Sequence, residues 1–313
     1  MVDAGVGLSQ EIAVDANDGV AAPALAGTAA RTVEVEGGRV RLNVLEAGSG
    51  TPLLLLHGAP QNHLEWRELL PRFAATHHVI CPDLRGAGWS DAPRRGYDRG
   101  RLAADVLDLL DALGIRRTAI IAHDWSALVS FDIAIRHPDR VSALVALSAP
   151  DPFVRVDARA MALMRSGWFM PLVPLPVVGE RFVSRGRQLV LRPMLASAGG
   201  EVPNSEIYRR LLRNPARAHA LSLLYRHTIM PSLVGLMTGR RRPTRLEVPT
   251  LVLMGGRDPA AALLRMRRTS AEVRELRHEI VPRAGHFLVD EVPDEVFDRA
   301  AAFLDVRSTD RRG

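Results

Sequence analysis

The chain has 313 residues, of which 47% are hydrophobic and 24% are charged, and this is enough apolar material for one large core with an insertion. All 41 basic residues are arginines spread along the chain among 35 acidic residues, so the net charge of +6 reflects biased composition and does not indicate a nucleic-acid-binding surface. The N-terminus has no signal pattern and no apolar run approaches about 18 residues, so we expect a soluble, cytoplasmic protein without a membrane span.

The first 30 residues have no clear periodicity, and we predict a mobile tail there. Two alternating runs then flank Gly37 and Gly38, which is typical of a β-hairpin. Residues 53–56 are four consecutive leucines, and such an uninterrupted run is typical of a strand buried on both faces of a parallel sheet.

Strands and helices alternate regularly over the next hundred residues. We predict strands at 78–82, 118–122 and 143–147, and helices at 63–75, 101–113 and from the turn after residue 122 to residue 137. The single cysteine, Cys81, lies in the first of these strands, where we expect a buried and unreactive thiol. Because the chain has one cysteine, an intramolecular disulfide is excluded. Repeated strand–helix–strand units predict an α/β fold with a mostly parallel sheet flanked by helices.

The alternation breaks after residue 150. Residues 153–242 contain helical patterns at 157–165, 205–212 and 216–236, a segment MPLVPLPVVG that is too rich in proline for a regular element, and an arginine run at 240–242 in a predicted loop. Strands resume at 250–254 and 278–281, with helices from about 260 and at 293–304, before a frayed end from 307. We therefore predict a core of residues 31–152 and 243–307, with residues 153–242 inserted as a helical lid, or cap, over the strand ends.

The segment after the strand at 118–122 has the pattern of a sharp strand–turn–helix elbow. Asp124 is its central residue, and small residues stand two before and two after it, at Ala122 and Ser126. A strained turn of this kind would present the carboxylate at the carboxyl edge of the sheet, beside the positive end of the next helix. From these neighbouring residues alone, Asp124 is either a nucleophile or a helix N-cap.

Three further segments follow predicted strands and complete a possible catalytic set. Gly58 allows a tight turn, so the amide of Ala59, with that of Trp125, would form an oxyanion hole. Asp258 follows two glycines and could orient a histidine through its Nδ1 proton. Among the 10 histidines, His286 alone stands between the last strand and the last helix. His57 and His123 flank the site, where we expect them to support the backbone through hydrogen bonds.

The order nucleophile, acid, histidine is that of α/β-hydrolases. The segments LLLLHGAP, VICPDLRGAGWSDAP, IIAHDWSALV, TLVLMGGRDP and AGHFLVDEVP resemble this superfamily over roughly residues 31–306. The His-Asp-Trp elbow resembles epoxide hydrolases and haloalkane dehalogenases, whose nucleophile is Asp. The resemblance implies Asp124 as nucleophile, His286 as base, Asp258 as its partner, and Ala59 with Trp125 as oxyanion donors.

The leaving group is either an epoxide oxygen or a halide. Epoxide hydrolases supply a proton from two lid tyrosines; Tyr225 resembles the second, whereas the expected position of the first reads Ser-Gly-Trp-Phe-Met at 166–170. Tyr208 is a possible substitute for the first tyrosine, although we expect it to be an exposed residue of a helix. To bind the leaving halide, many haloalkane dehalogenases use the tryptophan of the elbow together with an Asn at the position of Ala59, or with a second tryptophan in the lid. Trp168 is a candidate for that second tryptophan, but we expect it to pack in the core of the lid. Fluoroacetate dehalogenases place arginines just after the nucleophile, and this chain does not match them there.

The sequence thus predicts a hydrolase that opens an epoxide to a diol through an ester on Asp124. The alternatives are a haloalkane dehalogenase with the same three residues and an α/β-hydrolase scaffold that binds a ligand without turnover. No cofactor or metal is expected, because no zinc-ligand spacing, GxGxxG motif or P-loop is present. The expected partner is a small apolar organic substrate, with neither nucleic acid nor membrane, and the sequence leaves monomer and homodimer open.

Overall fold

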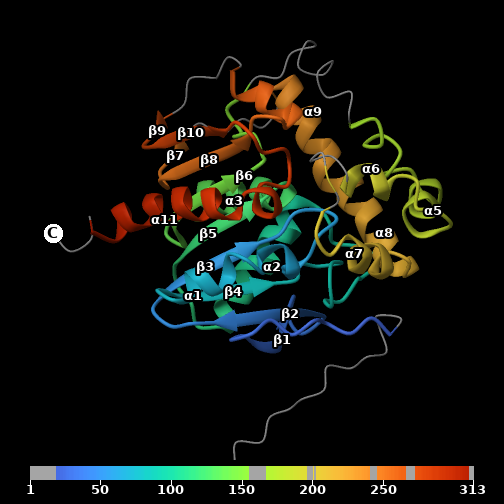
Figure 1. Ribbon diagram of the computed structural model, residues 1–313, viewed down its shortest axis with the longest axis horizontal. Helices are drawn as coiled ribbons and strands as arrows, with labels where there is room; N and C mark the ends of the chain where they lie inside the picture. Colours follow the sequence, from blue (N-terminus) through green and yellow to red (C-terminus); the bar gives the residue numbers. More distant parts are fainter. Residues whose placement is uncertain are drawn as a thin grey trace, which may run out of the picture.

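An eight-stranded sheet, in the order β1-β2-β4-β3-β5-β6-β8-β10, forms the centre of this computed structural model (Figure 1). The structure describes residues 19–154, 167–195, 200, 202–239, 245–265 and 272–309. Its strands are β1 (Ala29–Val35), β2 (Val40–Ala47), β3 (Thr51–Leu56), β4 (His77–Pro82), β5 (Thr118–His123), β6 (Val141–Leu147), β8 (Thr250–Gly255) and β10 (Leu276–Val281). All pairs from β4 to β10 are parallel, and the hairpin β1–β2 joins them in antiparallel orientation. The predicted mostly parallel sheet is confirmed.

Helices cover both faces of the sheet, as the leucine run in β3 predicts. The side chains of Leu54 and Leu56 pack into one core with α2 (Arg99–Ala112) and α3 (Trp125–Arg136). Those of Leu53 and Leu55 pack into a second core with α1 (Leu70–Ala74) and α11 (Pro293–Thr309). Successive residues of a strand point to opposite faces, so a strand between two helical layers has to be apolar throughout.

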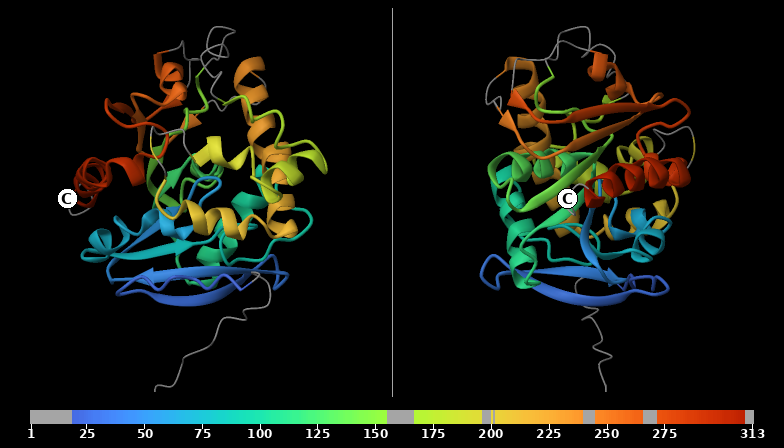
Figure 2. Two further views of the ribbon diagram at one scale, coloured as in Figure 1. Left: turned by 45° about the vertical axis from the view of Figure 1, so that its right-hand side comes forward. Right: turned by 90° about the vertical axis from the view of Figure 1, so that its left-hand side faces the viewer.

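A helical insertion follows β6 and precedes β8 in the chain, and it lies beside the carboxyl ends of the parallel strands (Figures 1 and 2). Its described helices are α5 (Val178–Ser184), α6 (Leu191–Leu195), α7 (Ser205–Leu211), α8 (Pro215–Leu224) and α9 (Met230–Thr238), with a π-helical turn at Tyr225–Ile229 joining the last two. After it, two short strands, β7 (Arg245–Leu246) and β9 (Glu272–Val273), pair with each other. A 3-10 helix at Pro259–Arg265 lies between them in the chain, and α10 (Leu288–Glu291) follows β10.

Several predicted bounds need correction. The mobile tail does not extend to residue 30, because Val20 is buried, its carbonyl accepts a hydrogen bond from the Trp89 ring at 2.8 Å, and β1 begins at Ala29. The helix predicted at 63–75 is a 3-10 turn at His63–Trp66 followed by α1. The helix predicted at 216–236 is interrupted by the π-helical turn, and the proline-rich segment ends inside α5.

Other predicted bounds differ less, or fall outside the described part of the chain. The frayed end predicted from residue 307 is wrong for residues 307–309, which belong to α11, and residues 310–313 lie outside the described residues. Residues 1–18, the predicted helix at 157–165 and the arginine run at 240–242 lie outside the described residues.

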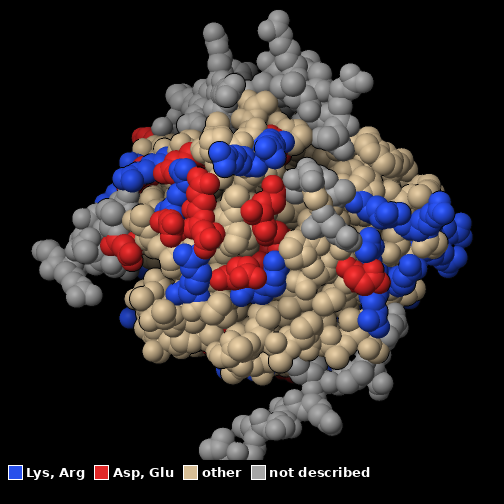
Figure 3. All heavy atoms as spheres, viewed as in Figure 1, with Lys and Arg blue, Asp and Glu red and all other residues tan. Residues whose placement is uncertain are grey.

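Surface charge is mixed on the face shown in Figure 3, where acidic and basic side chains alternate across the centre and a separate group of arginines lies near α5. Much of the arginine charge is paired; for example, Arg299 contacts Glu279 and Glu295, and Arg67 contacts Asp290. In the described part of the chain, every helix is too short or too polar to cross a membrane.

Candidate active site

Asp124 occupies a strained elbow between β5 and α3. Its backbone has φ 56° and ψ −126°, a region that non-glycine residues rarely adopt, and such strain is characteristic of functional positions. Ser126 is buried and its hydroxyl lies 2.9 Å from the Leu56 carbonyl and 2.8 Å from the His123 carbonyl, so it fastens the turn to β3. The Asp124 side chain makes no capping hydrogen bond to α3. Asp124 thus stands at the N-cap position of α3, but its side chain does not cap the helix, and the carboxylate is available for another role.

Loops after β8 and β10 bring Asp258 and His286 to this elbow. The Nδ1 of His286 donates to Asp258 Oδ2 at 2.8 Å, and its Nε2 lies 3.9 Å from Asp124 Oδ1. Asp258 also accepts a hydrogen bond from the Ala260 amide at 2.8 Å, so it caps the following 3-10 helix and orients the histidine at once. Since Nδ1 carries the proton, Nε2 is the nitrogen that is free to accept one near Asp124.

The charges of this trio depend on one another. Burial disfavours the imidazolium of His286, but Asp258, supported by Asp124, outweighs it and raises the pKa of His286 above its ordinary 6.5. Burial likewise works against the Asp258 carboxylate, but His286 and the Ala260 amide lower its pKa. Asp258 is thus held as an anion that stabilises a proton on His286 during a reaction.

The loop after β3 supplies the expected oxyanion donor. The amide of Ala59 donates to Asp124 Oδ2 at 3.1 Å, which places one donor at the carboxylate. Gly58 is required at this bend, because a Cβ there would lie 2.6 Å from His123 Nδ1 and 3.1 Å from Asp124 Cβ. The other expected donor, the Trp125 amide, is the first of α3 and directly follows Asp124 in the chain.

A cavity of about 180 Å³ opens above Asp124, between the sheet and the helical insertion. Asp124, Asp258, His286 and Tyr225 line it together with mainly apolar side chains, among them Leu128, Phe169, Met170, Met194, Ile229 and Leu233. Tyr225 lies in the π-helical turn and is 5% exposed. Burial, reinforced by the charge of Asp124, raises its pKa, so the phenol keeps its proton at neutral pH.

The structure corrects the predictions for two aromatic residues of the insertion. Tyr208 is not exposed; it is buried and lines a second, smaller cavity with Gln61 and Trp125, outside the cavity above Asp124. Trp168 is not packed in a lid core; it is 53% exposed and does not line the cavity above Asp124, whereas its neighbour Phe169 does. Neither side chain is placed to act on a group bound at Asp124.

The two histidines beside the site support the backbone, as predicted. His57 donates from Nδ1 to the Gly58 carbonyl and accepts at Nε2 from the Leu84 amide, both at 2.9 Å, and burial lowers its pKa, so the ring is neutral. His123 Nε2 donates to the His286 carbonyl at 2.9 Å.

Cys81 is buried, and burial raises the pKa of its thiol, in line with an unreactive role.

Sequence reasoning missed two polar residues of this neighbourhood. Glu65 is fully buried and lies 2.9 Å from His123 Nδ1, and the hydroxyl of Ser148 donates to the His286 carbonyl at 2.6 Å. The one signal that points to Glu65 is a carboxylate between Leu64 and Trp66 in a segment expected to pack against the sheet.

Comparison with known proteins places this chain in a family. A profile of the alpha/beta hydrolase fold matches residues 51–293. The chain is 30% identical to a soluble epoxide hydrolase of Corynebacterium sp. (strain C12), over 84% of this chain and 93% of that protein. It is 31% identical to a fluoroacetate dehalogenase of Burkholderia sp, over 89% and 96%. The crystal structure of epoxide hydrolase A from Mycobacterium thermoresistibile superposes with a TM-score of 0.71 at 27% identity, over 89% and 98%. The chain belongs to the α/β-hydrolase family and is a hydrolase of its epoxide hydrolase-like branch.

Proposed function

We propose that this enzyme hydrolyses epoxides of small apolar molecules to diols, through an ester on Asp124. The observation that carries the proposal is the cavity above Asp124, which brings together a carboxylate, a protonated phenol at Tyr225 and the imidazole of His286. These are the groups needed to attack a saturated carbon, protonate the ring oxygen and activate water. The helical insertion, which covers the cavity, would act as a cap that excludes bulk water.

In the first step an Asp124 oxygen attacks an epoxide carbon and the ring C–O bond breaks. Tyr225 gives its proton to the ring oxygen, so a hydroxyalkyl ester and a tyrosinate form. In the second step His286 Nε2 takes a proton from water, and the resulting hydroxide attacks the ester carbonyl carbon. The Ala59 amide, with that of Trp125, would stabilise the oxyanion. The tetrahedral intermediate then releases the diol alkoxide, which the His286 imidazolium protonates, and the remaining carboxyl proton returns to Tyr225.

The cavity favours an epoxide over a haloacid or haloalkane. A fluoroacetate-type substrate carries a carboxylate, yet no arginine stands among the described residues that line the cavity. A leaving halide needs polar hydrogens aimed at it, and the candidate donor Trp168 does not line the described cavity wall. Tyr225, in contrast, is a buried acid beside the nucleophile.

A three-substrate comparison tests the assignment. We expect the purified enzyme to convert a styrene-type epoxide to its diol, and to release little bromide from a 1-bromoalkane or fluoride from fluoroacetate. Diol is measured by chromatography and halide by ion-selective electrode. Halide release without diol would replace the proposal with a dehalogenase, and no product from any of the three would favour a non-turnover scaffold.

Replacement of Tyr225 by Phe should slow ester formation from the epoxide about 10²- to 10⁴-fold, because the ring oxygen then leaves without a proton donor. Single-turnover consumption of the epoxide measures this step. Tyr97→Phe is a matched control, since Tyr97 is also buried but does not line the cavity; its rate should stay near wild type. An unchanged single-turnover rate in Tyr225→Phe would remove Tyr225 from the mechanism.

A further inference from the structure

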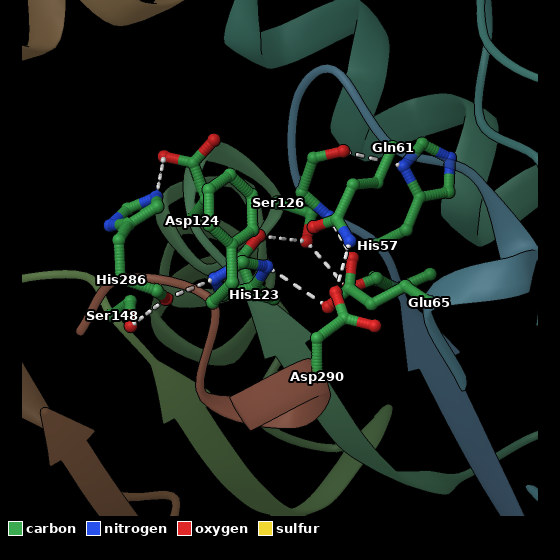
Figure 4. A network of polar contacts seen from close by, with 12 residues as sticks. His57, Gln61, Glu65, His123, Asp124, Ser126, Ser148, His286 and Asp290 are labelled. Carbon is green, nitrogen blue, oxygen red and sulfur yellow. Dashed lines mark hydrogen bonds and ion pairs between the residues drawn. The ribbon is translucent and has the colours of Figure 1, made fainter. Parts of the chain in front are cut away.

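A buried ion pair behind the site joins its three loops. Glu65, in the 3-10 turn at His63–Trp66, lies 2.9 Å from His123 Nδ1, and both side chains are fully buried (Figure 4). The second Glu65 oxygen, Oε2, accepts a hydrogen bond from the Gly58 amide at 2.9 Å, in the loop that carries the Ala59 donor. On its other side His123 donates from Nε2 to the His286 carbonyl. The pair therefore contacts the oxyanion loop, the nucleophile elbow and the loop of the base.

The contacts of the two ring nitrogens favour a charged His123. Its Nε2 faces a carbonyl oxygen, which only accepts, so this nitrogen carries a proton. Its Nδ1 lies 2.9 Å from the Glu65 carboxylate, and this ion-pair contact favours a second proton on the ring. Burial by itself would lower the pKa of His123, but Glu65 outweighs it and raises this pKa to about 9.

This charge lies close to the base. The rings of His123 and His286 are 5.2 Å apart between centroids, with the Glu65 carboxylate on the opposite side of His123 (Figure 4). Three ionisable groups dominate the field at His286: Asp258 and Asp124 favour its protonation, and His123 opposes it. His123 in turn interacts chiefly with Glu65 and Asp124. Without a cation at position 123, burial alone would oppose the effect of the two carboxylates on His286.

We propose that Glu65 holds His123 as a permanent imidazolium, whose positive charge opposes protonation of His286 and keeps that ring free to take a proton from water. Glu65 and His123 are then positioning and charge-setting residues, because neither lines the cavity where the substrate would react. The inference rests on the proposed role of His286 as the base of ester hydrolysis.

The test is the pH dependence of turnover in Glu65→Gln. His286 acts when deprotonated, and its pKa is raised above the ordinary 6.5. Wild-type turnover should therefore be present at alkaline pH and fall as the pH drops through the pKa of His286. Gln can still accept from the Gly58 amide and donate to a neutral His123, so the variant removes charge with little change of shape. We expect the acid limb to move up by about one pH unit. At pH values below both acid limbs, turnover of Glu65→Gln should then be about tenfold lower than that of the wild-type enzyme, and it should recover at alkaline pH.

Two further variants separate charge from packing. Glu65→Asp keeps the carboxylate and should return the acid limb toward its wild-type position. Glu291→Gln is the matched control, because the Glu291 carboxylate accepts from the Gly285 and Phe287 amides and so holds the same loop, whereas no ion pair joins it to an imidazole of the described residues. Its acid limb should not move upward. A Glu65→Gln variant whose limb stays at the wild-type position, or whose loss of turnover is equal at every pH, would overturn the inference.

A measurement without turnover keeps this inference distinct from the proposed function. Nitrogen-15 NMR of the wild-type histidines at pH 7 should show His123 with protons on both ring nitrogens, and a titration should show the pKa of His286 rising in Glu65→Gln. A neutral His123 in the wild-type protein would overturn the inference even if Glu65→Gln fails to fold. Absence of diol from the wild-type enzyme would instead contradict the proposed function, and the NMR result would still decide the state of His123.

Discussion

Asp124→Asn should lose turnover of the epoxide by about 10⁴-fold or more, because an amide oxygen is too weak a nucleophile to open the ring and form an ester. The substitution preserves the shape of the side chain and leaves an oxygen that can accept from the Ala59 amide, so the elbow should keep its geometry. Diol release under saturating epoxide measures the effect, and the midpoint of thermal unfolding checks that the fold is intact.

A matched control for this variant is Asp111→Asn. Asp111 lies near the end of α2, where it pairs with Arg140 at the surface, and it does not line the cavity above Asp124. The chemical change is the same, and turnover should stay near wild type. An Asp124→Asn enzyme with wild-type turnover would mean that Asp124 is not the nucleophile, and the N-cap interpretation would then have to be reconsidered despite the lack of a capping bond.

His286→Gln should separate the two chemical steps. Ester formation needs Asp124 and Tyr225, whereas ester hydrolysis needs a base for water, and removal of a general base slows its step about 10²- to 10⁴-fold. The variant should therefore consume about one equivalent of epoxide rapidly and then almost stop. A rapid-quench assay of epoxide and diol measures both phases.

The control for this second variant is His278→Gln. His278 in β10 also pairs with a buried aspartate, since its Nε2 lies 2.8 Å from Asp151, but neither residue lines the cavity above Asp124. This variant should turn over many equivalents of epoxide. If His286→Gln instead gave multiple turnovers of diol, His286 would not be the base of the second step.

The sequence predicted the elements of the sheet and the order of the site segments, because both depend on local patterns. Four leucines in β3 separate into two cores, and small residues around Asp124 permit the strained elbow. Gly58 and the glycines before Asp258 mark points where the chain leaves the sheet. Parallel strands then bring these turns to one edge. Chain order, together with the resemblance to α/β-hydrolases, predicted that His286 meets Asp258 there.

The predictions that failed depend on packing between distant segments. Tyr208 has the sequence context of an exposed helical residue, but α7 lies over the loop after β3, which buries the ring near Gln61. Trp168 has the composition of a core residue, yet it remains half exposed. No local pattern indicates that Glu65 meets His123, because 58 positions separate them in the chain and the contact exists only once β3 and β5 pair.

The helix pattern in the insertion was predicted less well than that of the core. A single amphipathic run suggested one helix over 216–236, whereas a π-helical turn at Tyr225–Ile229 interrupts it. Such turns are often found at functional sites, and here the turn places Tyr225 on the wall of the cavity.

The most direct test of the mechanism is the site of the covalent adduct in His286→Gln. After brief exposure to an epoxide, the intact mass of this variant should rise by the mass of one substrate molecule, and peptide mapping should locate the increase on Asp124. The double variant with Asp124→Asn should show no such increase. An adduct on a different residue, or diol formation by His286→Gln with no adduct at any time, would contradict an ester on Asp124.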